Sequence, residues 1–143
     1  RMMNLVAQEK GVDLTYSAAE DCVVLATKDE IHQVIYNLTD NAVKYSAIGG
    51  SVQVSLGREG EQVILAVSDN GAGIPEADLP RIFERFYRVD KARSRAAGGT
   101  GLGLSIVSDT VKRRGGSVEA ANRSGGGAVF TVRWPALERR EEP

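Results

Sequence analysis

The stretch Gly98-Gly-Thr-Gly-Leu-Gly-Leu104 decides how this sequence is interpreted. A second glycine-rich stretch, Asp69-Asn-Gly-Ala-Gly-Ile-Pro75, precedes it. Glycine is a poor core residue, because it loses much conformational entropy in a helix or strand and has no side chain to pack. The two stretches therefore predict that the backbone comes close to a ligand. At Gly98–Leu104 we expect phosphate groups, because a helix follows directly, and the first N–H groups and the dipole of a helix favour anions.

Each glycine stretch is a weak signal by itself. The chain lacks the Gly-Lys-Ser/Thr of a Walker loop and the G-x-G-x-x-G order of a Rossmann fold. Asn70-Gly71 is typical of a hairpin, but Ile74-Pro75 and a helical pattern follow instead of a partner strand. Asp69 stands where an apolar strand ends. An ionised aspartate only accepts hydrogen bonds, so it suits the exocyclic amine of adenine.

Size and composition are those of one small domain. The 143 residues are 42% hydrophobic and 26% charged, which is ordinary for a globular protein. We expect a single domain over residues 1–137 and a disordered tail over 138–143. The net charge of −1 favours neither a nucleic-acid partner nor a membrane surface. Cys22 is the only cysteine, which excludes an internal disulfide, and the abrupt start is typical of a piece of a longer chain.

Apolar periodicity predicts two helices and six strands. We expect strands at 12–16, 22–26, 51–56, 62–68, 117–121 and 128–134, and helices at 29–45 and 104–114. Asp29 is the predicted N-cap of the first helix, and Gly115-Gly116 ends the second. The predicted turns are 57–60 and Gly125-Gly-Gly127. The interleaving of helices and strands predicts an α/β fold with a mixed sheet.

The long predicted helix has a polar face with an unusual composition. At 100° per residue, Gln33, Asn37, Asp40, Asn41 and Lys44 share one arc, apart from the apolar stripe. Asparagine is a weak helix former, so two on one face need a reason. They could offer amide oxygen to Mg²⁺ beside a lysine for phosphate, or they could belong to a solvated face. The helix alone leaves both interpretations open.

Five motifs, in order, resemble those of sensor histidine kinases. Asn37-Leu-Thr-Asp-Asn41-Ala-Val-Lys44-Tyr45-Ser46 resembles the N box, and the stretches beginning at Asp69 and Gly99 resemble the two glycine boxes. Arg81-Ile-Phe-Glu-Arg-Phe-Tyr-Arg-Val-Asp90 resembles the F box. Gly125-Gly-Gly-Ala-Val-Phe130 resembles the closing glycine motif. The resemblance implies the catalytic ATP-binding domain of a two-component kinase with the Bergerat (GHKL) fold, an α+β two-layer sandwich. Its mixed, mostly antiparallel sheet has helices packed on one face.

The resemblance also implies roles for the polar helix face. Asn41 would hold Mg²⁺, and Asn37 would support the metal and phosphate site. Lys44 and Arg88 would contact phosphate, so these two and Asn37 are the candidate catalytic residues. The ring of Tyr45 would lie against the nucleotide, although Tyr45 also belongs to the apolar stripe and could pack in the core.

The nucleotide itself would lie between the two glycine boxes. Asp69 would read the adenine amine. The base pocket would be shaped by Gly71, Gly73 and Ile74. The phosphates would be wrapped by Gly99, Thr100, Gly101, Leu102, Gly103 and Leu104. Residues 76–98 would form a lid over ATP, anchored by Phe83 and Phe86. The basic side chains of this lid could bind phosphate or form a solvated face.

The resemblance implies transfer of the γ-phosphoryl group to a histidine rather than to water. ATP-hydrolysing relatives such as gyrase, Hsp90 and MutL carry a glutamate base four residues before the metal asparagine, where this chain has Asn37. His32 is the only histidine and lacks the acceptor motif, so we expect it at the surface or in helix packing. The acceptor would lie on a separate helical dimerisation domain of the same kinase, with a response regulator downstream.

The resemblance places this domain on the cytoplasmic side of a membrane-anchored homodimer, and we expect the fragment itself to be monomeric. Two alternatives stay open. The domain could bind ATP and act only by docking its partner, or it could be an autonomous GHKL ATPase.

Overall fold

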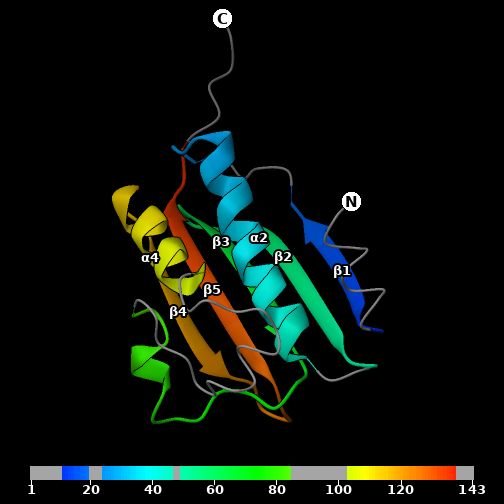
Figure 1. The fold of residues 1–143 in the computed structure, drawn as a ribbon. Helices are drawn as coiled ribbons and strands as arrows, with labels where there is room; N and C mark the ends of the chain where they lie inside the picture. Colours follow the sequence, from blue (N-terminus) through cyan, green and yellow to red (C-terminus); the bar gives the residue numbers. More distant parts are fainter. Residues whose placement is uncertain (1–10, 20–23, 47–48, 85–102, 138–143) are drawn as a thin grey trace, which may run out of the picture.

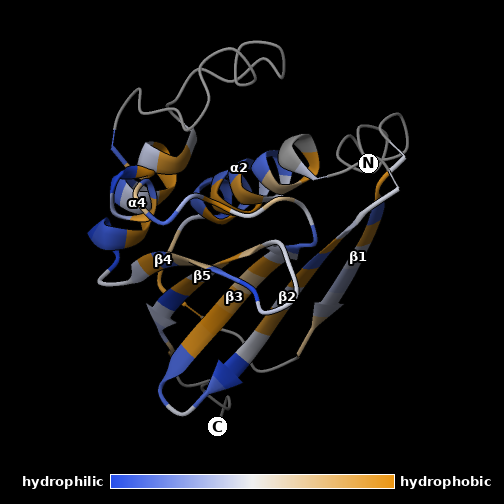
Figure 2. Cartoon of the chain, turned by 90° about the horizontal axis from the view of Figure 1, so that it is seen from below, coloured by the Kyte–Doolittle hydropathy of each residue, from blue (hydrophilic) through white to orange (hydrophobic). Residues whose placement is uncertain are grey.

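The computed structural model describes residues 11–19, 24–46, 49–84 and 103–137, with only the backbone of Lys44 and Tyr45. The described strands are β1 (Asp13–Ala18), β2 (Ser51–Glu59), β3 (Gln62–Asp69), β4 (Ser117–Asn122) and β5 (Ala128–Pro135). They form one sheet in the order β1-β2-β3-β5-β4, in which β1 is parallel to β2 and the other pairs are antiparallel (Figure 1). Helices α2 (Lys28–Tyr45) and α4 (Gly103–Arg113) cover one face (Figure 2). The predicted mixed, mostly antiparallel sheet is confirmed.

The core lies between this face and the two helices. Alternate residues of β3 and β5 point toward the helices, and the register pairs Val67 with Phe130 and Leu65 with Val132. All four are at most 2% exposed. Leu38 of α2 is fully buried against them. Burial of each such large apolar side chain stabilises the fold by about 1.5–3 kcal/mol, so the strand pair and the helices are held in one register.

The start of α2 differs from the sequence prediction. The N-cap is Thr27, not Asp29. The Thr27 hydroxyl accepts the Glu30 N–H at 3.1 Å, and the Glu30 carboxylate accepts the Thr27 N–H at 2.8 Å. This reciprocal capping box satisfies two backbone donors that the first turn leaves free, whereas Asp29 lies inside the helix. The Thr-x-x-Glu pattern at 27–30 was the sequence signal for it.

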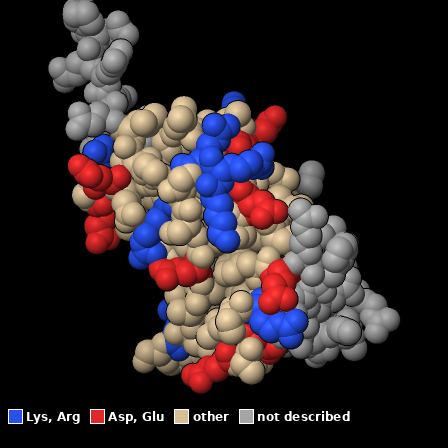
Figure 3. All heavy atoms as spheres, turned by 90° about the vertical axis from the view of Figure 1, so that its left-hand side faces the viewer, with Lys and Arg blue, Asp and Glu red and all other residues tan. Residues whose placement is uncertain are grey.

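The end of α4 agrees with the sequence prediction. Gly115 has a φ of +78°, and its N–H donates to the Lys112 carbonyl oxygen at 3.0 Å. The Gly116 N–H donates to the Val111 carbonyl oxygen at 3.0 Å, which completes a Schellman motif. Basic residues occupy the last turn of α4, where cations offset the negative end of the helix dipole. On this side of the molecule basic and acidic side chains are interspersed (Figure 3).

Two other local predictions need correction. The strand predicted at 22–26 is wrong over its described part, because Val24 forms a single antiparallel bridge with Ala136 and the chain then bends to begin α2. Cys22 lies outside the described residues. The turn predicted at 57–60 is shorter, because β2 continues to Glu59 and the chain reverses at Gly60 and Glu61. Gly60 supplies the left-handed backbone, with a φ of +58°.

Candidate functional site

Three elements of the predicted site meet at one end of the sheet. Strand β2 begins shortly after α2 ends, and Val52 pairs with Asp69, the last residue of β3. The C-terminal half of α2 therefore lies at the end of the sheet where Asp69 stands. Helix α4 runs antiparallel to α2, so its first turn is at the same end (Figure 1). The fold brings the polar helix face, the lone acid and the start of α4 together.

Asn37 of α2 lies beside the first residue of α4. Asn37 and Asn41 are both half-buried, whereas Gln33, one turn before Asn37, is exposed. A Cβ atom added at Gly103 would lie 3.9 Å from both Cγ and Oδ1 of Asn37. The amide of Asn37 thus faces the N-terminus of α4, where helix N–H groups favour an anion. An amide and a helix terminus are a combination that could accommodate a metal-bound phosphate.

Asp69 is almost enclosed by protein. Its residue is only 6% exposed, and its Oδ1 accepts the Gly71 N–H at 2.9 Å. Within the described residues its other carboxylate oxygen, Oδ2, accepts no hydrogen bond. One oxygen therefore fixes the loop that follows β3, and the other is available as an acceptor for a ligand N–H group.

The loop after Asp69 is tied to strands on both sides. The Ser51 N–H donates to Asn70 Oδ1 at 2.8 Å, which extends the β2–β3 pairing by one residue. The Ile74 N–H donates to Asn122 Oδ1 at 2.7 Å, at the end of β4. Ile74 is half-buried and packs against the core. The predicted base-pocket residues Gly71, Gly73 and Ile74 therefore lie on a loop with two fixed ends.

The β4–β5 turn packs against the backbone of Asp69. Arg123 Nη1 donates to the Asp69 carbonyl oxygen at 2.8 Å. A Cβ atom added at Gly127 would lie 1.9 Å from that same oxygen, so only glycine fits there. The predicted turn at Gly125–Gly127 is confirmed, but its contact with Asp69 was not predicted. The run of glycines was its only signal, because the partner lies more than fifty residues away in the chain.

Part of the predicted lid is described. After the loop come the 3-10 turn η1 (Leu79–Arg81) and Ile82, which is 4% exposed. Phe83 packs edge-on against Phe130, with ring centroids 6.2 Å apart, so this segment is fixed to the core at Phe83. Arg81 forms an ion pair with Glu84 at 3.2 Å, and both side chains are more than half exposed. The guanidinium of Arg81 is therefore paired with a carboxylate of the same segment.

Several predicted site residues lie outside the described residues. They are Arg88, Phe86, Gly99, Thr100, Gly101 and Leu102, together with the side chains of Lys44 and Tyr45. Gly103 and Leu104 are described as the first residues of α4, and both are half-buried. His32 is exposed on α2, so its surface position is confirmed.

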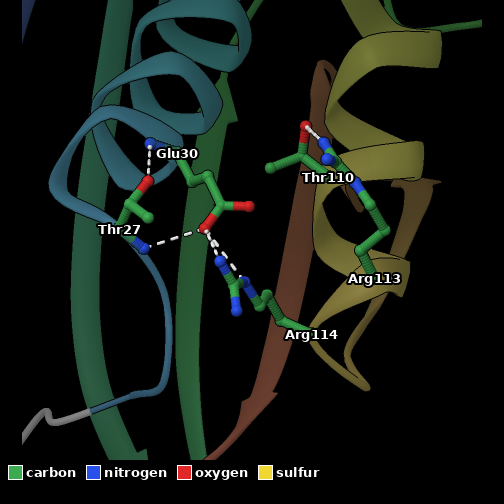
Figure 4. Close-up of polar contacts among 5 residues, drawn as sticks. All are labelled: Thr27, Glu30, Thr110, Arg113 and Arg114. Atoms are coloured by element: carbon green, nitrogen blue, oxygen red, sulfur yellow. Dashed lines mark hydrogen bonds and ion pairs between the residues drawn. The ribbon is translucent and has the colours of Figure 1, made fainter.

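The far end of the two helices is fastened by an ion pair (Figure 4). Arg114 donates to Glu30 Oε1 from Nε at 2.9 Å and from Nη2 at 2.6 Å. These hydrogen bonds, with a further one from Thr27, lower the pKa of Glu30 from 4.5 to about 2. The contact fixes the N-terminus of α2 against the C-terminus of α4. It thereby helps to set the spacing at the other end, where Asn37 meets Gly103.

The residues present fit a magnesium–phosphate group better than a metal held by protein alone. No group of three His, Cys, Asp or Glu side chains gathers within the described part of the chain. Mg²⁺ is commonly held by one or two protein oxygens together with waters and substrate phosphates. The half-buried amide of Asn41, one turn after Asn37, is an oxygen donor of that kind.

In the described ranges, no helix combines the length and the apolar character needed to cross a membrane.

Comparison with known proteins agrees with the fold and the motif order. Residues 26–138 match the family of histidine kinase-, DNA gyrase B- and HSP90-like ATPases. The chain is 44% identical over 124 residues to the sensor histidine kinase WalK of Bacillus subtilis, covering 85% of this chain and 20% of WalK. It therefore spans about a fifth of that relative.

Solved structures of histidine kinases share the fold. The mycobacterial sensor histidine kinase MprB superposes with a TM-score of 0.79 at 26% identity, over 96% of this chain and 97% of MprB. Full-length ShkA, solved in complex with AMPPNP, superposes with a TM-score of 0.81 at 30% identity, over 98% of this chain and 29% of ShkA. Since the family match covers most of the sequence, this chain belongs to the histidine kinase-, DNA gyrase B- and HSP90-like ATPases.

Proposed function

We propose that this chain binds Mg²⁺·ATP and transfers its γ-phosphoryl group to a histidine on a separate helical domain of the same sensor kinase. The observation that carries the proposal is that Asn37 meets the start of α4 at the sheet end where Asp69 stands. A Cβ atom added at Gly103 would lie 3.9 Å from the Asn37 amide. A nucleotide lying there would place its triphosphate at the helix terminus and its base at the acid.

In this proposal each end of the nucleotide has its own contacts. Asp69 Oδ2 accepts a hydrogen bond from the exocyclic amine of adenine. Gly71, Gly73 and Ile74 line the pocket around the base. Asn41 supplies an oxygen to Mg²⁺, which would neutralise phosphate charge when bound, and Asn37 supports it. The phosphates are contacted by Lys44, Arg88 and the segment from Gly99 to Leu104. The AMPPNP complex of the structurally similar ShkA supports a nucleotide ligand of this class.

Transfer to histidine is favoured over hydrolysis by the residue at position 37. Asn37 carries an amide, which cannot take a proton from an attacking water. An imidazole nitrogen is already nucleophilic. It attacks the γ-phosphorus, the bond to the β-phosphate oxygen breaks, and ADP leaves. Positioning and charge neutralisation provide most of the catalysis of phosphoryl transfer, so a site without its own base can support this reaction.

The test is a transfer assay with the acceptor domain of the parent protein. The 143-residue chain is mixed with Mg²⁺, γ-labelled ATP and that domain. We expect acid-labile, base-stable label on the acceptor, and little phosphate release when the acceptor is left out. Asn41→Ala should lose Mg²⁺-dependent ATP binding without unfolding, because Asn41 is only half-buried and faces away from the core stripe.

Each alternative function has its own outcome in this assay. ATP binding without labelled acceptor would support a docking module. Rapid phosphate release by the chain alone would support an autonomous ATPase. No binding of ATP would contradict the proposal as a whole.

A further inference from the structure

The end of strand β4 holds the base-pocket loop through one side chain. Asn122 Oδ1 accepts the Ile74 N–H at 2.7 Å, and Asn122 Nδ2 donates to the Ile74 carbonyl oxygen at 2.7 Å. Both backbone groups of Ile74 are therefore satisfied by one amide, in the way that a neighbouring strand would satisfy them. The two residues are 48 positions apart, so the contact links two separate segments of the chain.

The backbone next to Ile74 is shaped to admit this side chain. Gly73 has a φ of +80°, a left-handed conformation that favours glycine. A Cβ atom added there would lie 2.8 Å from Asn122 Oδ1 and 3.4 Å from the Gly127 carbonyl oxygen. The space that a side chain at position 73 would fill is thus taken by the Asn122 amide.

The neighbouring residue of the same turn reaches the other end of the loop. Arg123 Nη1 donates to the Asp69 carbonyl oxygen at 2.8 Å. The loop from Asp69 to Ile74 is thereby bound at its beginning by Arg123 and at its end by Asn122. Both contacts use backbone groups of the loop, so they leave Asp69 Oδ2 available to a ligand while the half-buried Ile74 side chain stays packed against the core.

We propose that Asn122 is a positioning residue, which holds the Gly73–Ile74 backbone in the conformation that receives the adenine ring and so contributes to the choice of adenine over guanine. The inference rests on the proposed function. Without the amide the loop would populate other conformations, and apparent affinity falls in proportion to the fraction of the loop that is competent to bind. Asn122 is exposed at its own position, so its removal leaves the core intact.

The test compares Asn122→Ala with Ser124→Ala, a control in the same exposed turn. Isothermal titration gives the dissociation constants of the full chain for Mg²⁺·ATP and Mg²⁺·GTP. Two lost hydrogen bonds, each typically worth a few-fold in an equilibrium constant, predict ATP binding about tenfold weaker in Asn122→Ala. The ratio of the GTP to the ATP dissociation constant should fall at least about threefold, since GTP binding depends less on the loop conformation that Asn122 holds. Ser124→Ala should match the wild type within about twofold.

Two further measurements separate positioning from stability. The thermal unfolding midpoint of Asn122→Ala should stay close to that of the wild type, while hydrogen exchange at the Ile74 N–H becomes faster. Gly73→Ala offers an independent perturbation, because its Cβ would displace the Asn122 amide. It should weaken ATP binding more in the wild-type background than in Asn122→Ala, a non-additivity that reports direct contact.

The outcomes are distinguishable. Unchanged ATP affinity and an unchanged ATP-to-GTP ratio in Asn122→Ala would overturn the inference and leave the proposed function standing. Equal weakening for both nucleotides would reduce Asn122 to a general structural role and overturn it too. If the wild type binds neither nucleotide, the proposed function fails and the inference fails with it. The hydrogen exchange of Ile74 would then still show whether the amide contact exists.

Discussion

Gly127 lies directly against the end of β3, and a single methyl group tests this contact. In Gly127→Ala the new Cβ would lie 1.9 Å from the Asp69 carbonyl oxygen, 2.7 Å from the Asp69 carbonyl carbon and 2.8 Å from Asn70 Cα. All three are backbone atoms, which cannot rotate away as a side chain can. One of the two segments must therefore shift by about 1.5 Å to reach an ordinary contact distance.

The cost of that shift can be worked out from the contacts it breaks. Gly127 has a φ of +94°, so alanine there carries a backbone strain of about 1–3 kcal/mol before any collision. The shift also disrupts the bond from the Arg123 N–H to the Gly127 carbonyl oxygen and that from Arg123 Nη1 to the Asp69 carbonyl oxygen, both 2.8 Å long. At about 1 kcal/mol each, the total destabilisation reaches roughly 3–5 kcal/mol.

Gly125→Ala is the matched control. Gly125 lies in the same turn with a φ of +90°, but a Cβ added there meets none of the described residues within 4 Å. The free energy of unfolding of Gly125→Ala should fall only by the backbone strain, about 1–3 kcal/mol. Urea unfolding of the two variants gives the difference in free energy, which belongs to the contact with Asp69, and ATP titration shows whether the base-pocket loop has moved. Equal destabilisation of the two variants would refute the close approach.

Three other substitutions test separate parts of the account. Asp69→Asn should weaken ATP binding about tenfold or more and erode the preference over GTP, because an amide replaces the charged acceptor; unchanged discrimination in a titration of both nucleotides would remove Asp69 from the base pocket. Since the pKa of Glu30 is lowered from 4.5 to about 2, the stabilisation by Arg114 is complete above pH about 4.5 and is lost as the pH falls toward 2. The advantage of the wild type over Glu30→Gln in thermal unfolding midpoint should therefore shrink across that range, and a constant advantage would contradict the ion pair. Thr39→Val should raise the free energy of unfolding by about 1 kcal/mol in urea, because Thr39 is 1% exposed and its Oγ1 has no hydrogen-bond partner in the part of the chain that the structure describes; a loss of stability would show that the hydroxyl is satisfied.

Periodicity was enough to predict the five described strands and the two described α-helices, but it also predicted a strand at 22–26 that is wrong over its described part. The apolar alternation of β5 survives in the structure as the buried residues Phe130, Val132 and Trp134, and the α2 stripe buries Val34, Leu38 and Ala42. Such patterns are local, and burial acts on each residue through its own face of the element. The prediction placed the α2 start at the wrong residue because Thr27 and Asp29 are both good caps, and only the partner Glu30 distinguishes them.

The residues that would contact a ligand could be predicted from the sequence, but the residues that hold them in place could not. The positions of Asn37 and Asp69 followed from a helix face and a strand end. Asn122 and Arg123 carry no local pattern, and their contacts depend on β5 lying between β3 and β4. Sheet order is set by tertiary packing rather than by periodicity, so a residue that acts across the sheet could not be found from the sequence alone.

The glycines of the two loops lack side chains for different structural reasons. The sequence suggested in each case that the backbone approaches a ligand. Among the described residues, a Cβ at Gly103 would meet the Asn37 amide alone, at 3.9 Å, which is an ordinary contact and compatible with a phosphate nearby. At Gly73 the space is already filled by Asn122 at 2.8 Å. A glycine-rich loop can thus be required by protein packed against it, and the base pocket that we propose would be supported from that side.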